Sequence, residues 1–561
     1  MKRKRLFSRA RTALLLITLC AAPVRGADPA PPSPAEPWQT QIQAMAARDG
    51  RDDILHFYVR RQFLPVWTEA GRVAELLRAI EDLTRDGLDP GEYGLNKLRD
   101  GLGERSSGLL HPDSCFELEA TRAYLDALHH LHFGRLDRQK VEPIWRSDPE
   151  IDRAERERRI AGIADAGLND IPAAFAAARP RDQGYEALRT AYGVLHARVT
   201  SPGARDWIPL PSGPALRPGA TDARVLILRR LLAGRGESAA AGDGADPATY
   251  DDELAEAVRR FQSTHHLVPD AVVGRATIAA LNVSPEDALA RLRVNLERAR
   301  WRARDMEAEM VLVDIAAARI TYLREGVAVW SARTQVGRSS RPTPILKSGI
   351  THFTFNPTWT VPPTILRKDK LPEIRRDVAY LERNRIRVLD RSGLELDPAS
   401  IDWDQPGAIL LRQDAGPENA LGQVAIRFPN RFFVYLHDTP SQSQFERDAR
   451  NFSSGCVRVE RALELVGLLM SDTGTHDGIE RYLSDGRTRN VPLQRPVPIL
   501  IDYWTAHADD AGAVSFRSDV YHHDARVLQA LDTAHLERPP PSACTACPSA
   551  TCDTKTSSSS E

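Results

Sequence analysis

The chain places a histidine and a cysteine where acyl-transfer chemistry could be carried out. His437 ends an aromatic and β-branched run from Arg431, which predicts a strand able to hold the imidazole ring in place. Nineteen residues later, Cys456 follows a Ser-Ser-Gly turn and precedes a helical pattern. A thiol close to a helix N-terminus is favoured as thiolate by the helix dipole and by unpaired N–H groups. A nearby imidazole could take the thiol proton and return it to a leaving group.

The residues around the cysteine add charge and hydrogen-bond donors. The N–H groups of Gly455, Cys456 and Val457 could stabilise a tetrahedral oxyanion, and Arg458 could bind a substrate carboxylate. A structural interpretation competes with this one, because a single mid-chain cysteine is more often a buried small side chain. In an exported chain Cys456 could also form a disulfide with Cys115. Taken alone, these residues leave both interpretations open.

Three further stretches extend the pattern upstream and between the two residues. They are Val336-Gly-Arg-Ser-Ser-Arg-Pro-Thr-Pro344, Asn356-Pro-Thr-Trp-Thr-Val-Pro-Pro363 and Pro417-Glu-Asn-Ala-Leu-Gly422. The corresponding stretches around the two residues are His437-Asp-Thr-Pro-Ser441, Phe445 and Ser453-Ser-Gly-Cys-Val-Arg458. Together they resemble the signature of L,D-transpeptidases, in which a histidine precedes a Ser-His-Gly-Cys-(Val/Ile)-Arg motif. The resemblance is to the long periplasmic branch of that family, which carries a capping insertion in its catalytic domain.

Two positions depart from the usual motif. Ser454 stands where the family commonly has a histidine, and Asp438 follows His437 where a glycine is frequent. The resemblance implies that Cys456 is the nucleophile and His437 the general base and acid. It also implies that the backbone carbonyl of Asp438 orients the imidazole ring. Positions similar to the family's substrate groove are Arg458, Ser454, Trp359 and Tyr435, although aromatic residues in strands are more often part of a core.

The reaction implied by the resemblance is transfer of a peptidoglycan stem peptide. Cys456 would attack the carbonyl between an L-centre and the terminal D-residue of a tetrapeptide stem and form a thioester. An amine of a neighbouring stem would then give a 3→3 cross-link, water would make the enzyme an L,D-carboxypeptidase, and a protein amine would attach that protein to the wall. An alternative from another class is a non-catalytic peptidoglycan-binding scaffold. We expect no cofactor and no metal, and the expected partners are peptidoglycan stem peptides and other cell-wall synthesis proteins.

The 561 residues are expected to form a multidomain α+β protein, with a mainly β catalytic domain after a helical domain and a small three-helix bundle. Apolar residues at three- and four-residue spacing predict the helical domain over 38–200. A Pro/Gly-rich linker over 201–220 precedes the bundle over 221–283, which is similar to peptidoglycan-binding modules through Leu254-Ala-Glu-Ala-Val-Arg-Arg-Phe-Gln262.

Strand patterns indicate the C-terminal half. Met310 to Ile315 and Arg319 to Leu323 predict strands of a catalytic domain over 305–505, interrupted by a helix-leaning cap insertion at about 367–420. A C-terminal extension over 506–537 and a disordered tail over 538–561 complete the chain.

The N-terminus has the order of a secretory signal. Basic residues up to Arg11 precede an apolar run from Ala13 to Ala22, and small residues follow. We expect residues 1–27 to be the signal, residues 28–37 to be a proline-rich linker, and the protein to be periplasmic. The membrane would be a partner only if the signal stays uncleaved. Lys+Arg 75 against Asp+Glu 76 gives a net charge of -1, so no nucleic acid is expected as a partner.

Six cysteines are too few for a disulfide scaffold. Cys20 lies in the signal, and a buried thiol is expected for Cys115. Cys544, Cys547 and Cys552 lie in the tail, where no further ligand with suitable spacing completes a zinc site, so a disordered segment is favoured.

Overall fold

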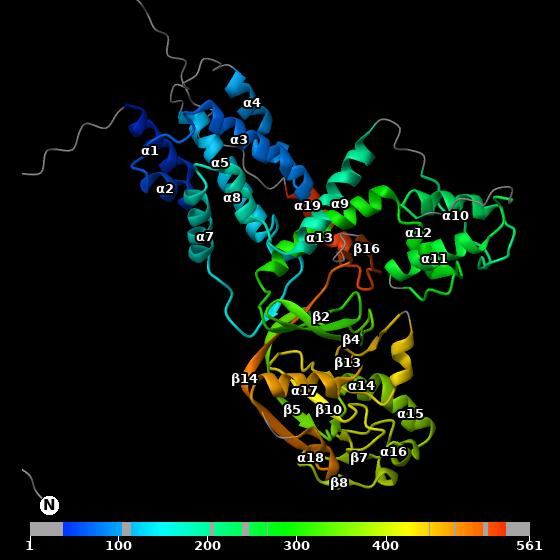
Figure 1. Cartoon of the computed structure of the whole chain (residues 1–561). Helices are drawn as coiled ribbons and strands as arrows, with labels where there is room; N and C mark the ends of the chain where they lie inside the picture. The colour runs from blue at the N-terminus through cyan, green and yellow to red at the C-terminus, as the bar shows by residue number, and fades with distance from the viewer. Residues whose placement is uncertain are drawn as a thin grey trace, which may run out of the picture.

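A computed structural model of the chain describes residues 37–103, 114–201, 207–237, 246–265, 267–447, 449–475, 478–508 and 514–534. The predictions for the secretory signal and for the tail cysteines lie outside the described residues. A helical domain, a small helical bundle and a β-rich domain surround helix α13 (Pro285–Ala303), as Figure 1 shows. Within the described parts of the chain, no helix is long and apolar enough to cross a membrane.

The N-terminal region is helical, as the spacing of its apolar residues predicts. Aspartates begin several of its helices, because the side chains of Asp152, Asp170 and Asp182 accept hydrogen bonds from N–H groups of the first turn. Buried side chains from successive helices, such as Tyr124, and from the segments between them, such as Trp67, form one core. The helices are α1 (Pro37–Asp49), α2 (Asp52–Val59), α3 (Ala70–Asp82), α4 (Leu95–Gly103), α5 (Ser114–Phe133), α6 (Arg138–Val141), α7 (Arg153–Ala166), α8 (Ile171–Ala178) and α9 (Gln183–Thr200).

The segment before the bundle is part of the bundle's structure. Leu210 and Leu216 are buried in its core, and the backbone of Leu210 exchanges hydrogen bonds of 2.7 and 2.8 Å with the side chain of Asn282. The prediction of a linker over 201–220 is therefore wrong from Leu210 onward. Burying these two leucines removes apolar surface from water, which favours packing of the segment on the bundle. The bundle helices are α10 (Arg224–Ala233), α11 (Asp252–Thr264) and α12 (Arg275–Leu281).

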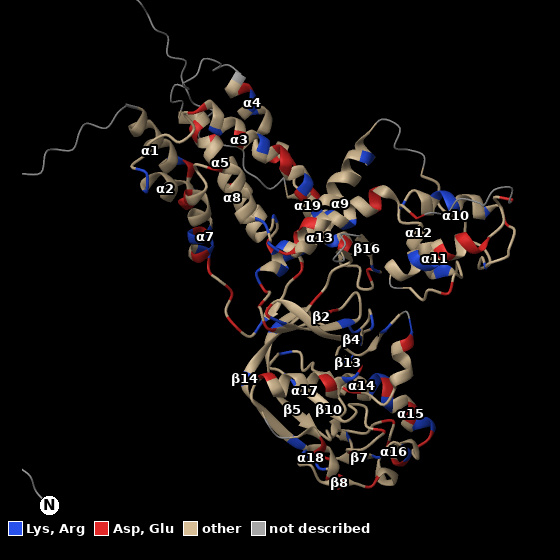
Figure 2. Ribbon diagram, viewed as in Figure 1, with Lys and Arg blue, Asp and Glu red and all other residues tan. Residues whose placement is uncertain are grey.

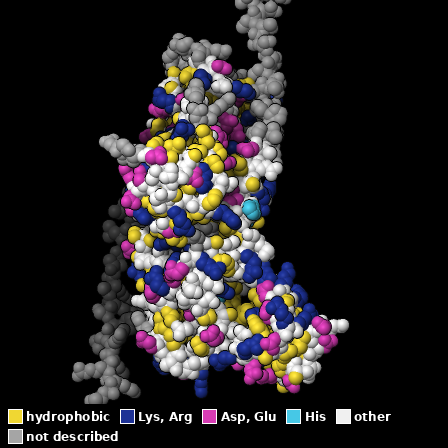
Figure 3. All heavy atoms as spheres, turned by 90° about the vertical axis from the view of Figure 1, so that its right-hand side faces the viewer, with side chains coloured by type: hydrophobic (Ala, Val, Ile, Leu, Met, Phe, Trp, Pro, Cys, Tyr) yellow, Lys and Arg dark blue, Asp and Glu magenta, His cyan; other side chains and the backbone are white. Residues whose placement is uncertain are grey.

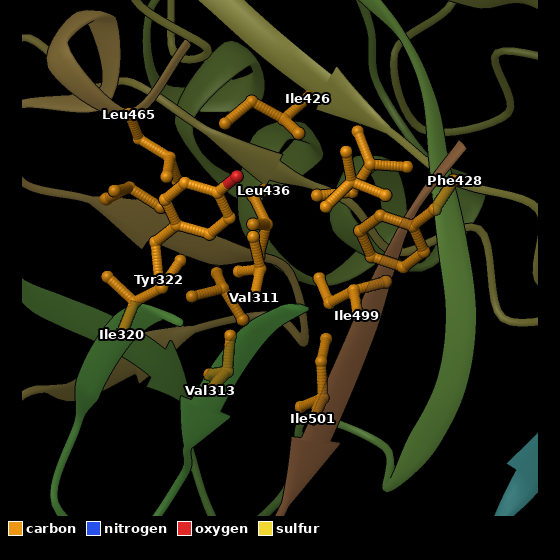
Figure 4. Close-up of a cluster of buried hydrophobic side chains, with 14 of the residues drawn as sticks. Val311, Val313, Ile320, Tyr322, Ile426, Phe428, Leu436, Leu465, Ile499 and Ile501 are labelled. Atoms are coloured by element: carbon orange, nitrogen blue, oxygen red, sulfur yellow. The ribbon is translucent and has the colours of Figure 1, made fainter. Parts of the chain in front are cut away.

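The β-rich domain is a sheet that closes on itself. Its strands follow the order β5-β10-β11-β13-β4-β3-β2-β14, and the path closes because β14 pairs with both β2 and β5. Apolar side chains fill its interior, among them Val311, Tyr322, Leu436 and Ile499 (Figure 4). The strands are β2 (Met310–Asp314), β3 (Arg319–Arg324), β4 (Val327–Gly337), β5 (Leu346–Phe355), β10 (Val424–Arg427), β11 (Leu436–His437), β12 (Asn451–Ser453, paired with β4), β13 (Val457–Val459) and β14 (Arg489–Asp502).

The predicted strand from Arg431 to His437 is much shorter in the structure. Only Leu436 and His437 form a strand. The side chain of Asn430 accepts hydrogen bonds from the N–H groups of Phe432 and Val434 and therefore holds the preceding residues in a turn. The two strands predicted from Met310 are confirmed as β2 and β3.

The cap is a separate unit with its own sheet. It begins at Trp359, before the predicted boundary near residue 367, and its strands follow the order β6-β9-β7-β8. Helices were expected there, and they alternate with these strands around a small apolar core that contains Ile374 and Trp403. The elements are β6 (Trp359–Thr360), α14 (Pro363–Ile365), η3 (Leu366–Lys370), α15 (Leu371–Arg376), α16 (Tyr380–Arg383), β7 (Ile386–Leu389), β8 (Glu395–Leu396) and β9 (Leu410–Gln413).

The domains are joined by a strand and by buried charges. Strand β1 (Trp145–Arg146), from the helical region, pairs in parallel with β5. Arg138 and Arg146 contact Asp305 and Asp502, and we call these four residues the ion-pair cluster. The C-terminal extension adds β15 (Ala506–Ala508), β16 (Val514–Phe516) and α19 (Asp524–Thr533). Figure 2 shows acidic and basic residues mixed where α9, α13 and α19 meet, and Figure 3 shows both signs interspersed with hydrophobic side chains over one face of the molecule.

Candidate active site

The histidine of the sequence motif ends strand β11, and the cysteine directly precedes the neighbouring parallel strand β13. In the register of β11 and β13, Leu436 pairs with Val457 and His437 pairs with Arg458. Because successive side chains of a strand point to opposite faces, Leu436 and Val457 enter the core, whereas the residues next to them point the other way. Five side chains thus share the outer face, and we call them the cysteine face: Arg427, Tyr435, His437, Cys456 and Arg458.

The turn that presents Cys456 is held by hydrogen bonds to Ser453. The Ser453 hydroxyl donates to the carbonyl of Cys456 (2.5 Å) and accepts from the N–H of Gly455 (3.1 Å). Gly455 has a φ of 115°, a conformation that residues with a side chain rarely adopt. The sulfur is half-buried against the core.

The position of Cys456 corrects one expectation from the sequence. Strand β13 follows the cysteine directly, and helix α17 (Ala462–Asp472) begins only after it. Val457 and Val459 bury their side chains, so the chain after the turn pairs with the sheet instead of starting a helix. The expected help from a helix N-terminus is therefore absent.

The electrostatics of the cysteine face favour neutral groups. Burial raises the pKa of the Cys456 thiol, and this outweighs the main-chain hydrogen bond from Tyr435 and the charges of Arg427 and Arg458, which lower it. Burial and the charge of Arg458 lower the pKa of His437 to about 3. The expectation of a thiolate is wrong for this structure. At neutral pH the pair is a thiol and a neutral imidazole.

A backbone carbonyl fixes the ring of His437. Its Nδ1 lies 2.5 Å from the carbonyl oxygen of Asp438. Because a carbonyl only accepts, Nδ1 carries the proton, and the lone pair of Nε2 is left for chemistry on the cysteine face. The carboxylate of Asp438 has a separate structural role, since it accepts from the N–H of Gln423 (2.9 Å) and from the side chain of Gln442 (3.2 Å).

Two of the three expected oxyanion donors are engaged elsewhere. The N–H of Gly455 donates to Ser453, and the N–H of Val457 donates to the carbonyl of Tyr435 (3.1 Å). The prediction of Gly455 and Val457 as oxyanion donors is therefore wrong, because the turn and the strand ladder use their protons. The N–H of Cys456 has no acceptor among the described residues, and it is the donor that the structure leaves available.

Three arginines near the cysteine have no carboxylate partner in the described parts of the chain. Arg458 donates to the side-chain oxygen of Gln335 (3.0 Å), while its Nε is buried without an acceptor. The guanidinium of Arg427 lies 3.9 Å from the ring centroid of Tyr435, and Arg338 donates to the carbonyl of Phe452 (3.0 Å). Such a group of cations can bind an anionic substrate.

Arg427 and Arg338 were missed as site residues in the sequence. Arg338 belongs to a stretch that resembles the family, and Arg427 ends an alternating strand pattern, but only the sheet register brings them to the cysteine.

Ser454 and Trp359 connect the site with the cap. The Ser454 hydroxyl accepts from Arg341 (2.8 Å), and Arg341 makes two hydrogen bonds to Asp369 of the cap, of 2.5 and 2.8 Å. Trp359 packs at the edge of the cap core, with the ammonium of Lys370 5.6 Å from its ring centroid. Trp359 therefore belongs to the cap, whereas Tyr435 lies on the cysteine face, its ring centroid 5.8 Å from that of His437.

The other expectations concern disulfides and metals. Cys115 and Cys456 are both in the thiol form, so the disulfide that the sequence allowed between them is not formed. Across the ranges that the structure describes, no three His, Cys, Asp or Glu side chains are grouped so that they could hold a metal ion.

Three family profiles match the chain. Residues 308–498 match the L,D-transpeptidase catalytic domain (YkuD), residues 52–191 match a scaffold domain, and residues 221–281 match the "Putative peptidoglycan binding domain".

One curated relative and several solved structures are similar to parts of the chain. A Haemophilus influenzae protein named "Putative L,D-transpeptidase" is 33% identical over 221 residues, which cover 39% of this chain and 45% of that protein. The chain thus spans less than half the length of this relative.

Two solved structures also match parts of the chain. An L,D-transpeptidase from Xylanimonas cellulosilytica is 17% identical, with 52% of this chain and 99% of that chain covered and a TM-score of 0.17. An L,D-transpeptidase from Mycobacterium smegmatis is 14% identical, with 35% and 58% covered and a TM-score of 0.17.

The helical region followed by a β-rich domain agrees with the α+β fold expected from the sequence. The matched profile spans the strands that carry the cysteine face. Residues 308–498, which carry the cysteine face, are thus similar to the catalytic domain of L,D-transpeptidases.

Proposed function

We propose that the protein is a peptidoglycan L,D-transpeptidase that forms 3→3 cross-links, with Cys456 as nucleophile and His437 as general base and acid. The observation that carries this proposal is the cysteine face itself. An imidazole at the end of β11 and a thiol in the turn directly before the neighbouring parallel strand β13 lie on the same side of the sheet, and arginines without carboxylate partners in the described structure lie beside them.

The first step forms a thioester. As the sulfur of Cys456 attacks the carbonyl between the L-centre and the terminal D-residue, the thiol proton moves to Nε2 of His437. The raised pKa of the thiol and the lowered pKa of the imidazole disfavour a preformed ion pair, so proton transfer accompanies the attack. When the tetrahedral intermediate collapses, the C–N bond breaks and His437 returns the proton to the leaving amine of the D-residue.

The surrounding groups support the charges that arise. The N–H of Cys456 would donate a hydrogen bond to the oxyanion. Arg427 and Arg458 would bind the carboxylate of the leaving D-residue or of the stem's diamino acid, because cations that have no carboxylate partner among the described residues gain most from an incoming anion. The Nδ1–H bond to Asp438 keeps the ring oriented in both proton-transfer steps.

The second step transfers the acyl group to an amine. A side-chain amine of a neighbouring stem, deprotonated by His437, attacks the thioester, and Cys456 leaves as a thiol. The cap, joined to the cysteine turn through Arg341, supports exclusion of water and hence amine transfer over hydrolysis.

The N-terminal pattern and the bundle suggest where this reaction takes place. A cleaved secretory signal would deliver the protein to the periplasm, where stem peptides are found. The bundle that matches a peptidoglycan-binding profile would then hold the enzyme near its substrate.

The proposal is tested in cells that lack their own L,D-transpeptidases. Wild type, Cys456→Ala and the matched control Cys115→Ala would be expressed at equal level, and digested wall analysed by mass spectrometry. We expect 3→3 dimers with wild type and Cys115→Ala, and none with Cys456→Ala. Equal dimer from wild type and Cys456→Ala would falsify the proposal. Tripeptide stems that accumulate without dimers would instead identify an L,D-carboxypeptidase.

A further inference from the structure

We propose that Tyr521, in the C-terminal extension beyond the matched catalytic domain, is a positioning residue for the cysteine turn, and that it acts through Thr343. This inference rests on the proposed role of Cys456 and names residues that support it from outside the family's domain.

Tyr521 closes the loop between β4 and β5. Its hydroxyl donates to the carbonyl of Gly337 (2.6 Å) and accepts from the N–H of Thr343 (3.1 Å). The loop folds back closely on Gly337, since a Cβ on Gly337 would lie only 2.3 Å from the carbonyl oxygen of Arg341 and 2.6 Å from the nitrogen of Thr343. The phenol therefore satisfies a backbone acceptor and a backbone donor that the folded loop brings together.

Thr343 connects this loop to the cysteine turn by hydrogen bonds. Its hydroxyl accepts from the N–H of Gly337 (2.9 Å) and donates to the carbonyl of Gly455 (2.9 Å), and its side chain is buried. The carbonyl of Gly455 and the N–H of Cys456 belong to one planar peptide unit, in which they point in opposite directions. Fixing the carbonyl of Gly455 therefore fixes the direction of the Cys456 N–H, which is the donor left for the oxyanion.

The extension holds Tyr521 in turn. Its ring stacks on that of Tyr503, with centroids 5.5 Å apart and planes 16° apart. Its backbone N–H donates to the hydroxyl of Tyr503 (3.2 Å), which donates to Asp519 (2.7 Å). The backbone of the neighbouring Val520 accepts from Ser339 of the same loop (2.9 Å). The phenol is thus placed by contacts that do not involve the substrate.

The test separates positioning from general stability. The variants are Tyr521→Phe and Thr343→Val, which remove one hydroxyl each, and Thr343→Ser, which retains it. The matched control is Tyr322→Phe, which removes a hydroxyl bonded to Glu309 and Asp472, away from the loop. Each full-length protein would be assayed with a disaccharide-tetrapeptide substrate for kcat and KM, normalised to the thiol titre of Cys456. Alkylation of Cys456 by iodoacetamide, which forms no oxyanion, reports the intrinsic reactivity of the thiol.

We expect kcat of Tyr521→Phe and Thr343→Val to fall roughly 10- to 100-fold, because an oxyanion donor is misdirected. KM and the alkylation rate should stay within about twofold, Thr343→Ser should recover most of kcat, and Tyr322→Phe should match wild type. If kcat of both Tyr521→Phe and Thr343→Val equals that of wild type, or if kcat of Tyr322→Phe falls as much as theirs, the role of Tyr521 is overturned. The proposed function would be unaffected by either result. A wild-type enzyme without activity on this substrate would overturn the proposed function, and the inference with it.

Discussion

The cysteine face and the ion-pair cluster both contain buried or half-buried arginines, but only the arginines of the ion-pair cluster have carboxylate partners among the described residues. In the ion-pair cluster, Arg138 lies 3.2 Å from Asp305 and 2.6 Å from Asp502, and Arg146 lies 2.5 Å from Asp305. On the cysteine face, Arg458 has only the neutral amide of Gln335 as a partner among the described side chains. A cation that is withdrawn from water without a carboxylate partner costs stability. The fold accepts this cost at the candidate site, whereas between the domains it pairs each arginine of the ion-pair cluster with a carboxylate.

The pKa shifts express the same difference. Burial lowers the pKa of Arg146 in the ion-pair cluster, but the hydrogen bonds and charge of Asp305 more than offset this and hold the pKa above its ordinary value. Burial and the charge of Arg338 leave the pKa of Arg458 below its ordinary value. Arginines paired with carboxylates thus stabilise the contact between the domains, whereas Arg458, which has no carboxylate partner among the described residues, can bind an anion of the substrate.

The largest effect is expected from breaking the ion-pair cluster. Asp305→Asn keeps the size of the side chain but removes an anion shared by the buried Arg138 and the half-buried Arg146, so unfolding free energy should fall by about 3–5 kcal/mol. Activity per folded molecule should not change. Urea unfolding measures the effect, with the exposed Asp148→Asn as control, expected within about 0.5 kcal/mol of wild type. A loss below about 1 kcal/mol would contradict the structural role assigned to the pairs.

The cysteine face should respond in the opposite sense. Arg458→Gln removes a cation that has no internal carboxylate partner in the described structure, so unfolding free energy should change by less than about 1 kcal/mol. The value of kcat/KM should fall roughly 10- to 100-fold, because a charge-assisted bond to the substrate carboxylate is lost. Arg495→Gln, which removes an exposed arginine paired with Glu309, is the matched control. A stability loss as large as that of Asp305→Asn, with activity intact, would remove the contrast between the two regions.

The pH profile sharpens the comparison further. Because burial and Arg458 lower the pKa of His437 to about 3, the base stays unprotonated and kcat/KM should remain level from about pH 8 down to about pH 5. In Arg458→Gln the repulsion between residue 458 and a protonated His437 is removed, so the pKa of His437 should rise. The acid limb of the kcat/KM profile should therefore move to higher pH. The same shift makes stability fall as pH drops from about 6.5 towards 3, since the unfolded histidine binds the proton first. An acid limb near pH 6.5 in wild type would show an ordinary histidine instead.

The smallest effect is expected at the joint between cap and turn. Asp369→Asn weakens a partly exposed pair with Arg341, so unfolding free energy should change by less than about 1 kcal/mol. If the cap excludes water, the ratio of hydrolysis to amine transfer should rise about twofold, as measured by product analysis in the presence of an amine acceptor. Arg376→Gln, whose side chain is exposed in the cap, serves as control. Identical product ratios for Asp369→Asn and wild type would show that this pair between cap and turn has no part in excluding water.

Local patterns predicted much of the fold. The alternation from Met310 and the three- and four-residue spacing of the N-terminal region indicate β2, β3 and the helices, because each of these elements buries one face. Strands of two or three residues, such as β1 and β13, have no detectable period and exist only because a partner strand supplies their hydrogen bonds. Missing β13 led directly to the wrong expectation of a helix N-terminus at Cys456.

The candidate site was predicted only in part for the same reason. The motif indicates Cys456 and His437, but the sheet register decides which side chains accompany them. Arg427 joins the site by cross-strand pairing, and Tyr521 reaches the loop from 178 residues beyond Thr343. The raised pKa of the thiol depends on burial, which spacing in the sequence does not reveal.

The most direct test of the account is to trap the acyl-enzyme. Purified wild type, Cys456→Ala and Cys115→Ala would be mixed with disaccharide-tetrapeptide, quenched in acid within the first turnover, and examined by intact-protein mass spectrometry followed by peptide mapping. We expect a mass gain equal to the disaccharide-tripeptide acyl group, located on Cys456 in wild type and Cys115→Ala and absent from Cys456→Ala. Turnover of the substrate by Cys456→Ala, or an adduct on another residue, would contradict it.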